Sequence, residues 1–472
     1  MRVSSNENAA TPDQNNATAA SSPHNAIFVS GITTSYAAYA NSRHAISDES
    51  ANSAYPGRCR MRISSGVYFK TSTRWDWANL KSVARQQGFT PNQVSWILSK
   101  GALAMIRSAI RPAALFVAAL LAAPCALPQS KPKTKKVIFV MTDGLRWQEV
   151  FQGADAALMN KENGAVADVE GLRKTYWRES AAERRQILMP FLWNVIAKQG
   201  QIYGNREAAA EAYVTNGRNF SYPGYNETFT GFGDPRIDSN EKKYNANVTL
   251  FEWLHAKPAF KGKVAAFGAW DTFPWIINAP RAGFPVNAGY EPMQMTPMTP
   301  KMEIVNELKA EAPRDVAGES HDIYPFHTAL EYWRVKKPSL LYLSLGETDH
   351  WAHGGNYSEY LRAARRVDEY VKRLWDAAQK HPDYRGVTTL VLTVDHGRGE
   401  APVTWKGHGE KLPQSKYIWM AFLGPDTKPL GERKNIPAVT QSQIAATIAA
   451  LLGEDYNAAE PKAGKPIADV LP

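Results

Sequence analysis

The segment SLLYLSLGETDHWAH, residues 339–353, joins an apolar run to two polar side chains, Asp349 and His353. The run is typical of a buried strand, and the polar pair lies just beyond its carboxyl end. Open α/β sheets bind their ligands at that position, and carboxylate and imidazole are both ligands of divalent metals. A helix-capping Asp followed by an ordinary surface His would give the same pattern, so the pair needs support from other segments.

Two further segments repeat this arrangement. The run VIFVMT ends at Asp143 and the run TTLVLTV ends at Asp395, which His396 follows directly. Such continuous apolar runs are typical of parallel strands that are buried on both faces. Asp143 alone also fits a turn or a helix cap. Together the runs predict an α/β fold with a mostly parallel central sheet, flanked by helices and interrupted by helical and loop excursions.

Helix signals and loop signals lie between and after these runs. Residues 357–379 place apolar or small side chains on one face, which predicts a packing helix. Residues 440–452 predict a helix that opens with a capping box, Thr440 with Gln443. Residues 279–301 are rich in Pro, Gly and Met and predict a long loop, either a substrate lid or a surface excursion.

Composition limits the possible functions. The chain has 472 residues, of which 44% are hydrophobic, and a formal net charge of +10. Residues 1–130 hold 12 Lys and Arg against 5 Asp and Glu, which leaves 43 against 40 for the rest of the chain. A nucleic-acid partner is therefore not implied for the folded part. Both cysteines, Cys59 and Cys125, precede residue 131, so a metal beyond them would be held by oxygen and nitrogen alone.

The first 130 residues differ from the remainder. Residues 1 to about 55 are rich in Ser, Asn, Ala and Thr, a composition that favours disorder. Met105 begins a segment with two arginines, an apolar run at 113–123 and a polar exit, which is typical of a secretory signal peptide and too short to span a bilayer. We expect residues 105–130 to be that signal, 1–104 to be a disordered or spurious extension and 131–472 to be a secreted or periplasmic catalytic domain. An internal buried helix is the alternative reading of the signal segment.

Two glycine-flanked or turn-like segments supply further candidates. WKGHGE, residues 405–410, places His408 between two glycines, where the backbone is free to bring an imidazole inward. In NFSYPGYNETFTG, residues 219–231, Pro223 and Gly224 predict a turn that exposes the Ser221 hydroxyl near a helix amino terminus. That hydroxyl fits either a nucleophile or an N-cap.

If Asp143, Asp349 and Asp395 converge, the repulsion between their carboxylates requires positive charge nearby. Two carboxylates about 4 Å apart repel by about 4 kcal/mol at an effective dielectric constant of 20, so three clustered ones require cations. Two divalent metals roughly 3.5 to 4 Å apart would neutralise them and would stabilise both the attacking and the leaving oxygen of an in-line displacement.

These motifs, in this order, resemble the alkaline phosphatase superfamily, and most closely its type I phosphodiesterase/nucleotide pyrophosphatase branch and the related phosphoglycerate-mutase-like metalloenzymes. The resemblance covers residues 136–456 and implies two divalent metals, most simply zinc, with manganese as the alternative. It implies one metal on Asp349, His353 and His408. It implies the other on Asp143, Asp395, His396 and Ser221. Ser221 would also be the nucleophile that attacks phosphorus and forms a phosphoserine intermediate, and Asn226 and Arg398 would contact phosphate oxygens.

The chain also departs from its relatives. The sulfatase pattern has Arg four residues after the nucleophile, and Tyr225 stands there instead; the phosphodiesterase branch usually has Thr where this chain has Ser221. The expected activity is hydrolysis of a small-molecule phosphoric ester, with the monoester or diester preference and the oligomeric state left open. The alternatives are a phosphoglycerate-mutase-like phosphotransferase, a sulfatase, and a metal-binding protein without turnover.

Overall fold

The computed structural model describes residues 131–314 and 318–472, all of which lie in one compact unit. The expected extension and signal segment, with both cysteines, lie outside the described residues. Among the residues described, no helix combines the length and the apolar character needed to cross a bilayer.

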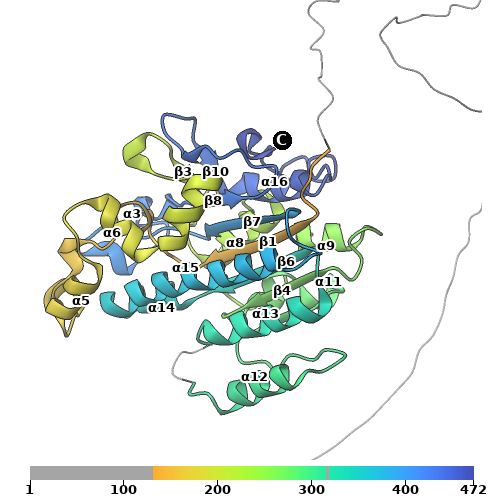
Figure 1. Cartoon of the computed structure of the whole chain (residues 1–472), viewed down its shortest axis with the longest axis horizontal. Helices are drawn as coiled ribbons and strands as arrows, with labels where there is room; N and C mark the ends of the chain where they lie inside the picture. The colour runs from red at the N-terminus through yellow and green to blue at the C-terminus, as the bar shows by residue number, and fades with distance from the viewer. Residues whose placement is uncertain (1–130, 315–317) are drawn as a thin grey trace, which may run out of the picture. The chain divides into compact units, whose positions relative to one another are not determined.

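A mostly parallel sheet forms the centre of the unit, as the sequence predicts (Figure 1). Five neighbouring strands run parallel, β8 is antiparallel to both of its neighbours, and the last pair is parallel again. In spatial order the strands are β5 (Val286–Ala288), β4 (Val264–Gly268), β6 (Leu340–Leu345), β1 (Lys136–Thr142), β7 (Thr388–Val394), β8 (Met420–Leu423), β2 (Gln201–Tyr203) and β9 (Gly431–Glu432). A separate two-stranded sheet pairs β3 (Ala212–Tyr213) with β10 (Val439–Thr440).

The three predicted apolar runs are the three central strands β6, β1 and β7. Every residue of β6 and β7 is buried, as is all of β1 after its first residue. Because β6, β1 and β7 are adjacent and parallel, their carboxyl ends lie at one edge of the sheet. The residues that follow each strand therefore meet at that edge.

Helices cover both faces of the sheet. Figure 1 shows α13 and α15 across the near face, with α8 behind the sheet. On the far side, α8 and α9 present Phe229 and Phe251 to Phe139 of β1 and Tyr342 of β6, with ring centroids 4.9 to 6.5 Å apart. The helices of the first half are α3 (Trp147–Gln152), α4 (Lys161–Gly164), α5 (Val169–Tyr176), α6 (Ala181–Leu188), α7 (Ala197–Gln199), α8 (Ser221–Thr230), α9 (Leu250–His255), α10 (Phe273–Ile276) and α11 (Ala279–Ala282). Those of the second half are α12 (Pro300–Glu311), α13 (Ile323–Lys336), α14 (Glu347–His353), α15 (Tyr357–Lys380) and α16 (Ile444–Leu451).

The two predicted helices form where expected. The apolar face of α15 is buried along its length, from Tyr360 to Ala378. Thr440 and Gln443 make the capping box at the turn that leads into α16. Both predictions rested on local signals, a 3.6-residue period and a reciprocal cap, which need no distant partner.

The long loop predicted at residues 279–301 is wrong in part. It contains the short helix α11 and the strand β5, and its end opens α12. Pro280 starts α11 and Gly283 ends it, while Val286–Ala288 extends the sheet by pairing with β4. A structureless segment of this length is uncommon inside a compact domain, because its backbone polar groups need partners.

Candidate metal centre

The edge of the sheet at the ends of β1, β6 and β7 gathers the predicted metal ligands. Asp143 follows β1 directly and Asp395 follows β7, while β6 leads through Gly346 into α14, which carries Asp349 and His353. Gly144 lies in a left-handed conformation with φ of 57°, and a side chain there would collide with Arg398 and Asp349. The chain therefore turns tightly at the point where the acids meet.

The first group of ligands is Asp143, Asp395 and His396. The Nε2 atom of His396 lies 3.3 Å from Asp143 Oδ1 and 3.4 Å from Asp395 Oδ2. Both carboxylate oxygens are buried and accept no hydrogen bond within the described structure. Their partner oxygens are engaged: Tyr225 donates to Asp143 Oδ2, and the Gly144 backbone N–H donates to Asp395 Oδ1. Two orphaned oxygens facing one imidazole nitrogen fit the donor set of a divalent metal.

The second ring nitrogen of His396 fixes its orientation. Nδ1 lies 2.9 Å from the Gly397 carbonyl, to which it donates, and this leaves Nε2 as the nitrogen that faces the carboxylates. Burial lowers the pKa of His396, but the Asp395 and Asp143 carboxylates outweigh it and raise the pKa to about 9. Burial also raises the pKa of Asp395, and Asp143 raises it further. Both raised pKa values show that positive charge stabilises this group, and a divalent cation would supply that charge.

The second group is Asp349, His353 and His408. Asp349 lies 3.2 Å from His353 Nε2 and 3.6 Å from His408 Nε2, and the two imidazole nitrogens are 2.9 Å apart. His408 Nδ1 is 3.3 Å from the Asn219 carbonyl, so Nε2 again faces the acid. Burial, assisted by His396, lowers the pKa of His408 to about 2, which keeps it a neutral ligand. The side chain of His353 is 50% exposed, so this group opens to solvent.

The two groups adjoin each other. The rings of His396 and His408 stack with centroids 3.9 Å apart. Asp349, His396 and His408 also have ligand atoms within 4.8 Å of one another, so His396 borders both groups. The structure therefore brings the six predicted carboxylate and imidazole ligands, three of each kind, into one cluster.

Ser221 lies at the start of α8, beside the first group. Its Oγ is 3.4 Å from His396 Nε2, and the residue is buried. Phe220 occupies the N-cap position, so Ser221 is not the cap that the sequence left open as an alternative. The turn predicted at Pro223 and Gly224 is wrong, because both lie in the first turn of α8, where a proline lacks only an N–H that has no helical partner.

Gly224 allows α8 to sit directly on the end of β7. A Cβ at this position would lie 2.4 Å from the carbonyl oxygen of Asp395. The close approach explains how the amino terminus of α8 reaches the cluster.

The two residues predicted to contact phosphate, Asn226 and Arg398, bind other parts of the protein instead. Asn226 is fully buried, its Nδ2 donates to the Phe232 carbonyl, and its Oδ1 accepts from Asn245 and Asn247, so it belongs to a polar network behind α8. Arg398 is also buried and donates to Asp349 and to the carbonyls of Trp405 and Lys406. Burial tends to raise the pKa of Asp349, but Arg398 holds it well below the usual range. Arg398 therefore keeps Asp349 ionised instead of pointing a free guanidinium at substrate.

Tyr225 replaces the arginine of the sulfatase pattern with a neutral hydroxyl. It is buried, donates to Asp143 Oδ2 over 3.0 Å and lies 3.0 Å from Ser344 Oγ. The position that departs from sulfatases thus orients a predicted metal ligand.

Two polar residues near Ser221 were missed by sequence reasoning. Asn240, in the exposed loop after α8, accepts a hydrogen bond from the backbone N–H of Tyr222 over 3.0 Å. Glu227 of α8 is fully buried and accepts hydrogen bonds from four donor groups of Thr215 and Asn216, which precede the nucleophile. Neither residue belongs to a local motif, and only the folded chain brings its partners close.

Replacing Glu227 with glutamine is expected to lower the free energy of unfolding by about 1 to 3 kcal/mol, because an amide cannot accept from all four donor groups and leaves partly buried donors unpaired. Urea unfolding would measure the change. Glu369→Gln, on the exposed side of α15, is a matched control that should change stability by less than about 0.5 kcal/mol. Equal stability of the Glu227→Gln variant and the wild type would show that the hydrogen bonds from Thr215 and Asn216 to Glu227 do not stabilise the fold.

A mostly parallel α/β sheet whose carboxyl edge gathers acids and imidazoles has a candidate metal site at the position where open α/β sheets bind their ligands. The model of the family "Type I phosphodiesterase / nucleotide pyrophosphatase" matches residues 159–421, and the chain belongs to this family, within the alkaline phosphatase superfamily. The match includes every predicted site residue except Asp143.

Solved structures of the same superfamily resemble the chain. The lipoteichoic acid synthase LtaP from Listeria monocytogenes is 12% identical with a TM-score of 0.44, covering 69% of this chain and 73% of its own. An alkaline phosphatase superfamily protein from Vibrio parahaemolyticus is 15% identical with a TM-score of 0.42, covering 74% and 75%. The alkaline phosphatase PafA is 12% identical with a TM-score of 0.45, covering 74% and 100%. Among curated protein sequences, none matches the chain.

Proposed function

We propose that the chain hydrolyses small-molecule phosphoric esters with Ser221 as the nucleophile and two divalent metal ions, zinc in the first instance, as cofactors. One observation carries the proposal: the Ser221 hydroxyl and the orphaned oxygens of Asp143 and Asp395 all lie within 3.4 Å of His396 Nε2. A nucleophile, two uncompensated carboxylates and an oriented imidazole at one point are the parts of a metal-assisted displacement.

The ligand types favour zinc over manganese. The cluster offers three imidazoles and three carboxylates and no thiolate. Imidazole suits zinc, whereas manganese prefers sites made of carboxylate, carbonyl and water oxygens. In the proposal Asp143, Asp395, His396 and Ser221 hold one ion, and Asp349, His353 and His408 hold the other.

In the proposed reaction Ser221 forms the covalent intermediate and a bound metal would activate its hydroxyl. A bound divalent metal lowers the pKa of a hydroxyl, so that the serine oxygen becomes nucleophilic near neutral pH. The Ser221 hydroxyl gives up its proton and its oxygen attacks phosphorus. A bond from Oγ to phosphorus forms, the bond from phosphorus to the alcohol oxygen breaks, the alcohol leaves after taking up a proton from water, and a phosphoserine results. Hydrolysis of the phosphoserine by water returns the serine and releases phosphate or a phosphate monoester.

The surroundings of Ser221 suit a phosphoryl group. Ser221 is the first residue of α8, and a helix amino terminus favours an anion. Asn240 lies against the backbone N–H of Tyr222, next to the nucleophile. We assign the phosphoryl contacts to the backbone N–H of Ser221 and the side-chain amide N–H of Asn240 in place of Asn226 and Arg398, whose polar atoms are already occupied.

A panel of aryl esters tests the function. We expect the metal-loaded protein to release p-nitrophenol from a phosphate monoester or diester and to act at least tenfold more slowly on p-nitrophenyl sulfate, because Tyr225 stands where sulfatases have Arg. Faster sulfate hydrolysis would identify a sulfatase. Retention of two metals with no hydrolysis of any ester would identify a metal-binding protein without turnover.

Export is a separate part of the proposal. The layout of residues 105–130 supports a cleaved signal and a secreted or periplasmic enzyme. Mass spectrometry of protein from its native cells should find peptides only from beyond that segment. Recovery of peptides from before residue 100 would contradict it.

A further inference from the structure

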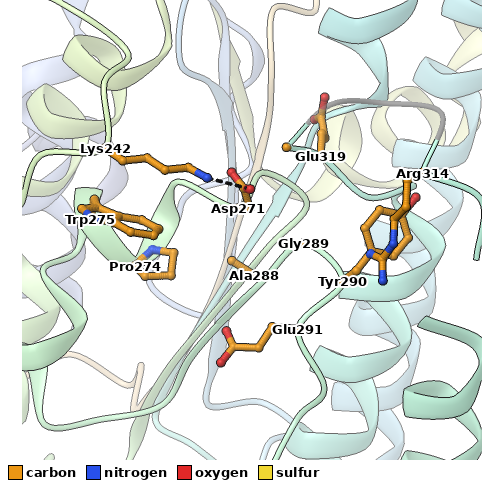
Figure 2. A pocket seen from close by; sticks show the side chains of 11 residues that line it. Lys242, Asp271, Pro274, Trp275, Ala288, Gly289, Tyr290, Glu291, Arg314 and Glu319 are labelled. Carbon is orange, nitrogen blue, oxygen red and sulfur yellow. Dashed lines mark hydrogen bonds and ion pairs between the residues drawn. The ribbon is translucent and has the colours of Figure 1, made fainter. Parts of the chain in front are cut away.

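A pocket of about 690 Å³ opens at the carboxyl ends of β4 and β5. Its polar and aromatic lining includes Lys242, Asp271, Trp275, Tyr290, Arg314 and Glu319 (Figure 2). The volume lies in the range of sites for small organic ligands, about 300 to 1,000 Å³. None of these residues belongs to the candidate metal centre.

One contact and one sequence neighbour connect the pocket with the metal centre. Glu319 packs against Gly346, so closely that a Cβ on Gly346 would come 1.4 Å from Glu319 Oε1, and Gly346 begins the helix that carries Asp349. On another side, Lys242 follows two residues after Asn240, which accepts from the N–H of Tyr222 beside Ser221. The pocket is therefore the candidate site for one substituent of an ester held at Ser221.

The two aromatic rings of the lining, Trp275 and Tyr290, pack against other side chains of the protein. Trp275 stacks on Tyr244 with centroids 5.9 Å apart, and the Lys242 ammonium lies 5.1 Å from the Trp275 centroid. The Arg314 guanidinium lies 3.8 Å from the centroid of Tyr290 (Figure 2). A nucleobase stacks best on an open ring face, whereas Trp275 and Tyr290 each have a cation over a ring face.

The charges of the lining are mixed. Lys242 Nζ lies 2.7 Å from Asp271 Oδ2, so these two neutralise each other. Arg314 adds a positive charge, whereas burial and the nearby acids raise the pKa of Glu319, and Figure 2 shows the Glu291 carboxylate directed away from the other charged groups. A cation would meet Lys242 and Arg314 and an anion would meet Asp271, so the lining favours neither sign of charge. A hydroxyl group can accept from a cation and donate to a carboxylate at the same time.

We infer that this pocket binds the alcohol part of the ester and that this alcohol is a neutral, polyhydroxylated group, such as a glycosyl or polyol residue, and not a nucleoside. The inference rests on the proposed function, because it assigns the substituent of an ester that Ser221 attacks. Asp271 and Lys242 bind the hydroxyl groups of this alcohol through charge-assisted hydrogen bonds.

Three p-nitrophenyl phosphodiesters, differing only in the second alcohol, test the inference on the metal-loaded full chain. The second alcohols are methanol, glucose and thymidine. We expect kcat/KM for the glucosyl ester to exceed that for the thymidine ester at least tenfold. If the protein hydrolyses only monoesters, glucose 1-phosphate, thymidine 5′-monophosphate and methyl phosphate take their places, with phosphate release as the readout.

Two substitutions assign the preference to the pocket. Asp271→Asn and Lys242→Met should each reduce the ratio of glucosyl to methyl ester kcat/KM at least fivefold. The matched control is Asp376→Asn, which removes the acid of an exposed Lys and Asp pair on α15 and should leave every rate unchanged. Preference for the thymidine ester, or a ratio that neither substitution alters, would overturn the inference while hydrolysis of the methyl ester upholds the proposed function. Absence of hydrolysis of every ester would overturn both.

Discussion

Replacing Ser221 with alanine is expected to lower kcat by about 10³-fold or more while both metals remain bound. The substitution removes the only side-chain hydroxyl placed next to His396 by the first turn of α8 within the described structure. The three carboxylates and three imidazoles of the cluster do not depend on that hydroxyl for their positions. Steady-state kinetics and elemental analysis on one sample measure both effects.

Ser221→Thr is the matched variant, since it keeps the hydroxyl and should retain measurable turnover. A phosphorylated protein should accumulate when the wild type is quenched in acid during turnover, and no label should appear in Ser221→Ala. Undiminished activity of Ser221→Ala would remove this serine from the chemistry, and the metal centre would then have to activate another nucleophile.

Replacing Asp395 with asparagine is expected to lose at least one metal per chain and to lower kcat/KM by about 10³-fold or more. The neutral amide removes one of the two orphaned oxygens that face His396, and with it a negative charge that a cation would neutralise. Asp395 is fully buried and its other oxygen accepts backbone N–H bonds from Gly144 and His396. Metal content by elemental analysis and the rate on an aryl ester give the two readouts.

Asp368→Asn is the matched control for this second prediction. Asp368 is also buried and accepts from two backbone N–H groups, those of Phe191 and Leu192, but it belongs to neither ligand group. Its substitution should cost stability and leave the metal content unchanged. Wild-type metal stoichiometry in Asp395→Asn would refute the ligand role of Asp395.

The parts of the fold and of the candidate site that could be predicted from sequence are those coded locally. Apolar runs long enough to be buried on both faces indicated β1, β6 and β7, and an acid after each run indicated where the strands end. Because parallel strands share a carboxyl edge, Asp143, Asp395 and the residues of α14 could be expected to converge before any coordinates were known.

The parts that could not be predicted depend on distant partners. The same Pro223 and Gly224 signal fits a turn or the start of a helix, and only the approach of α8 to the Asp395 carbonyl decides between them. Asn226 has the polarity of a phosphate ligand, yet Asn245 and Asn247 take up its oxygen. The pocket combines residues from Lys242 to Glu319, whose proximity depends on how β5 joins the sheet.

The central claim is that acids and imidazoles from three strand ends form one binuclear metal centre. The most direct test is the metal content of the purified full chain, measured by elemental analysis before and after exhaustive chelation, with activity followed as zinc is returned. The account predicts about two metal ions per chain, loss of activity on chelation and full recovery at two equivalents of zinc. A protein that hydrolyses phosphate esters at an undiminished rate with less than about 0.1 metal ion per chain would contradict it.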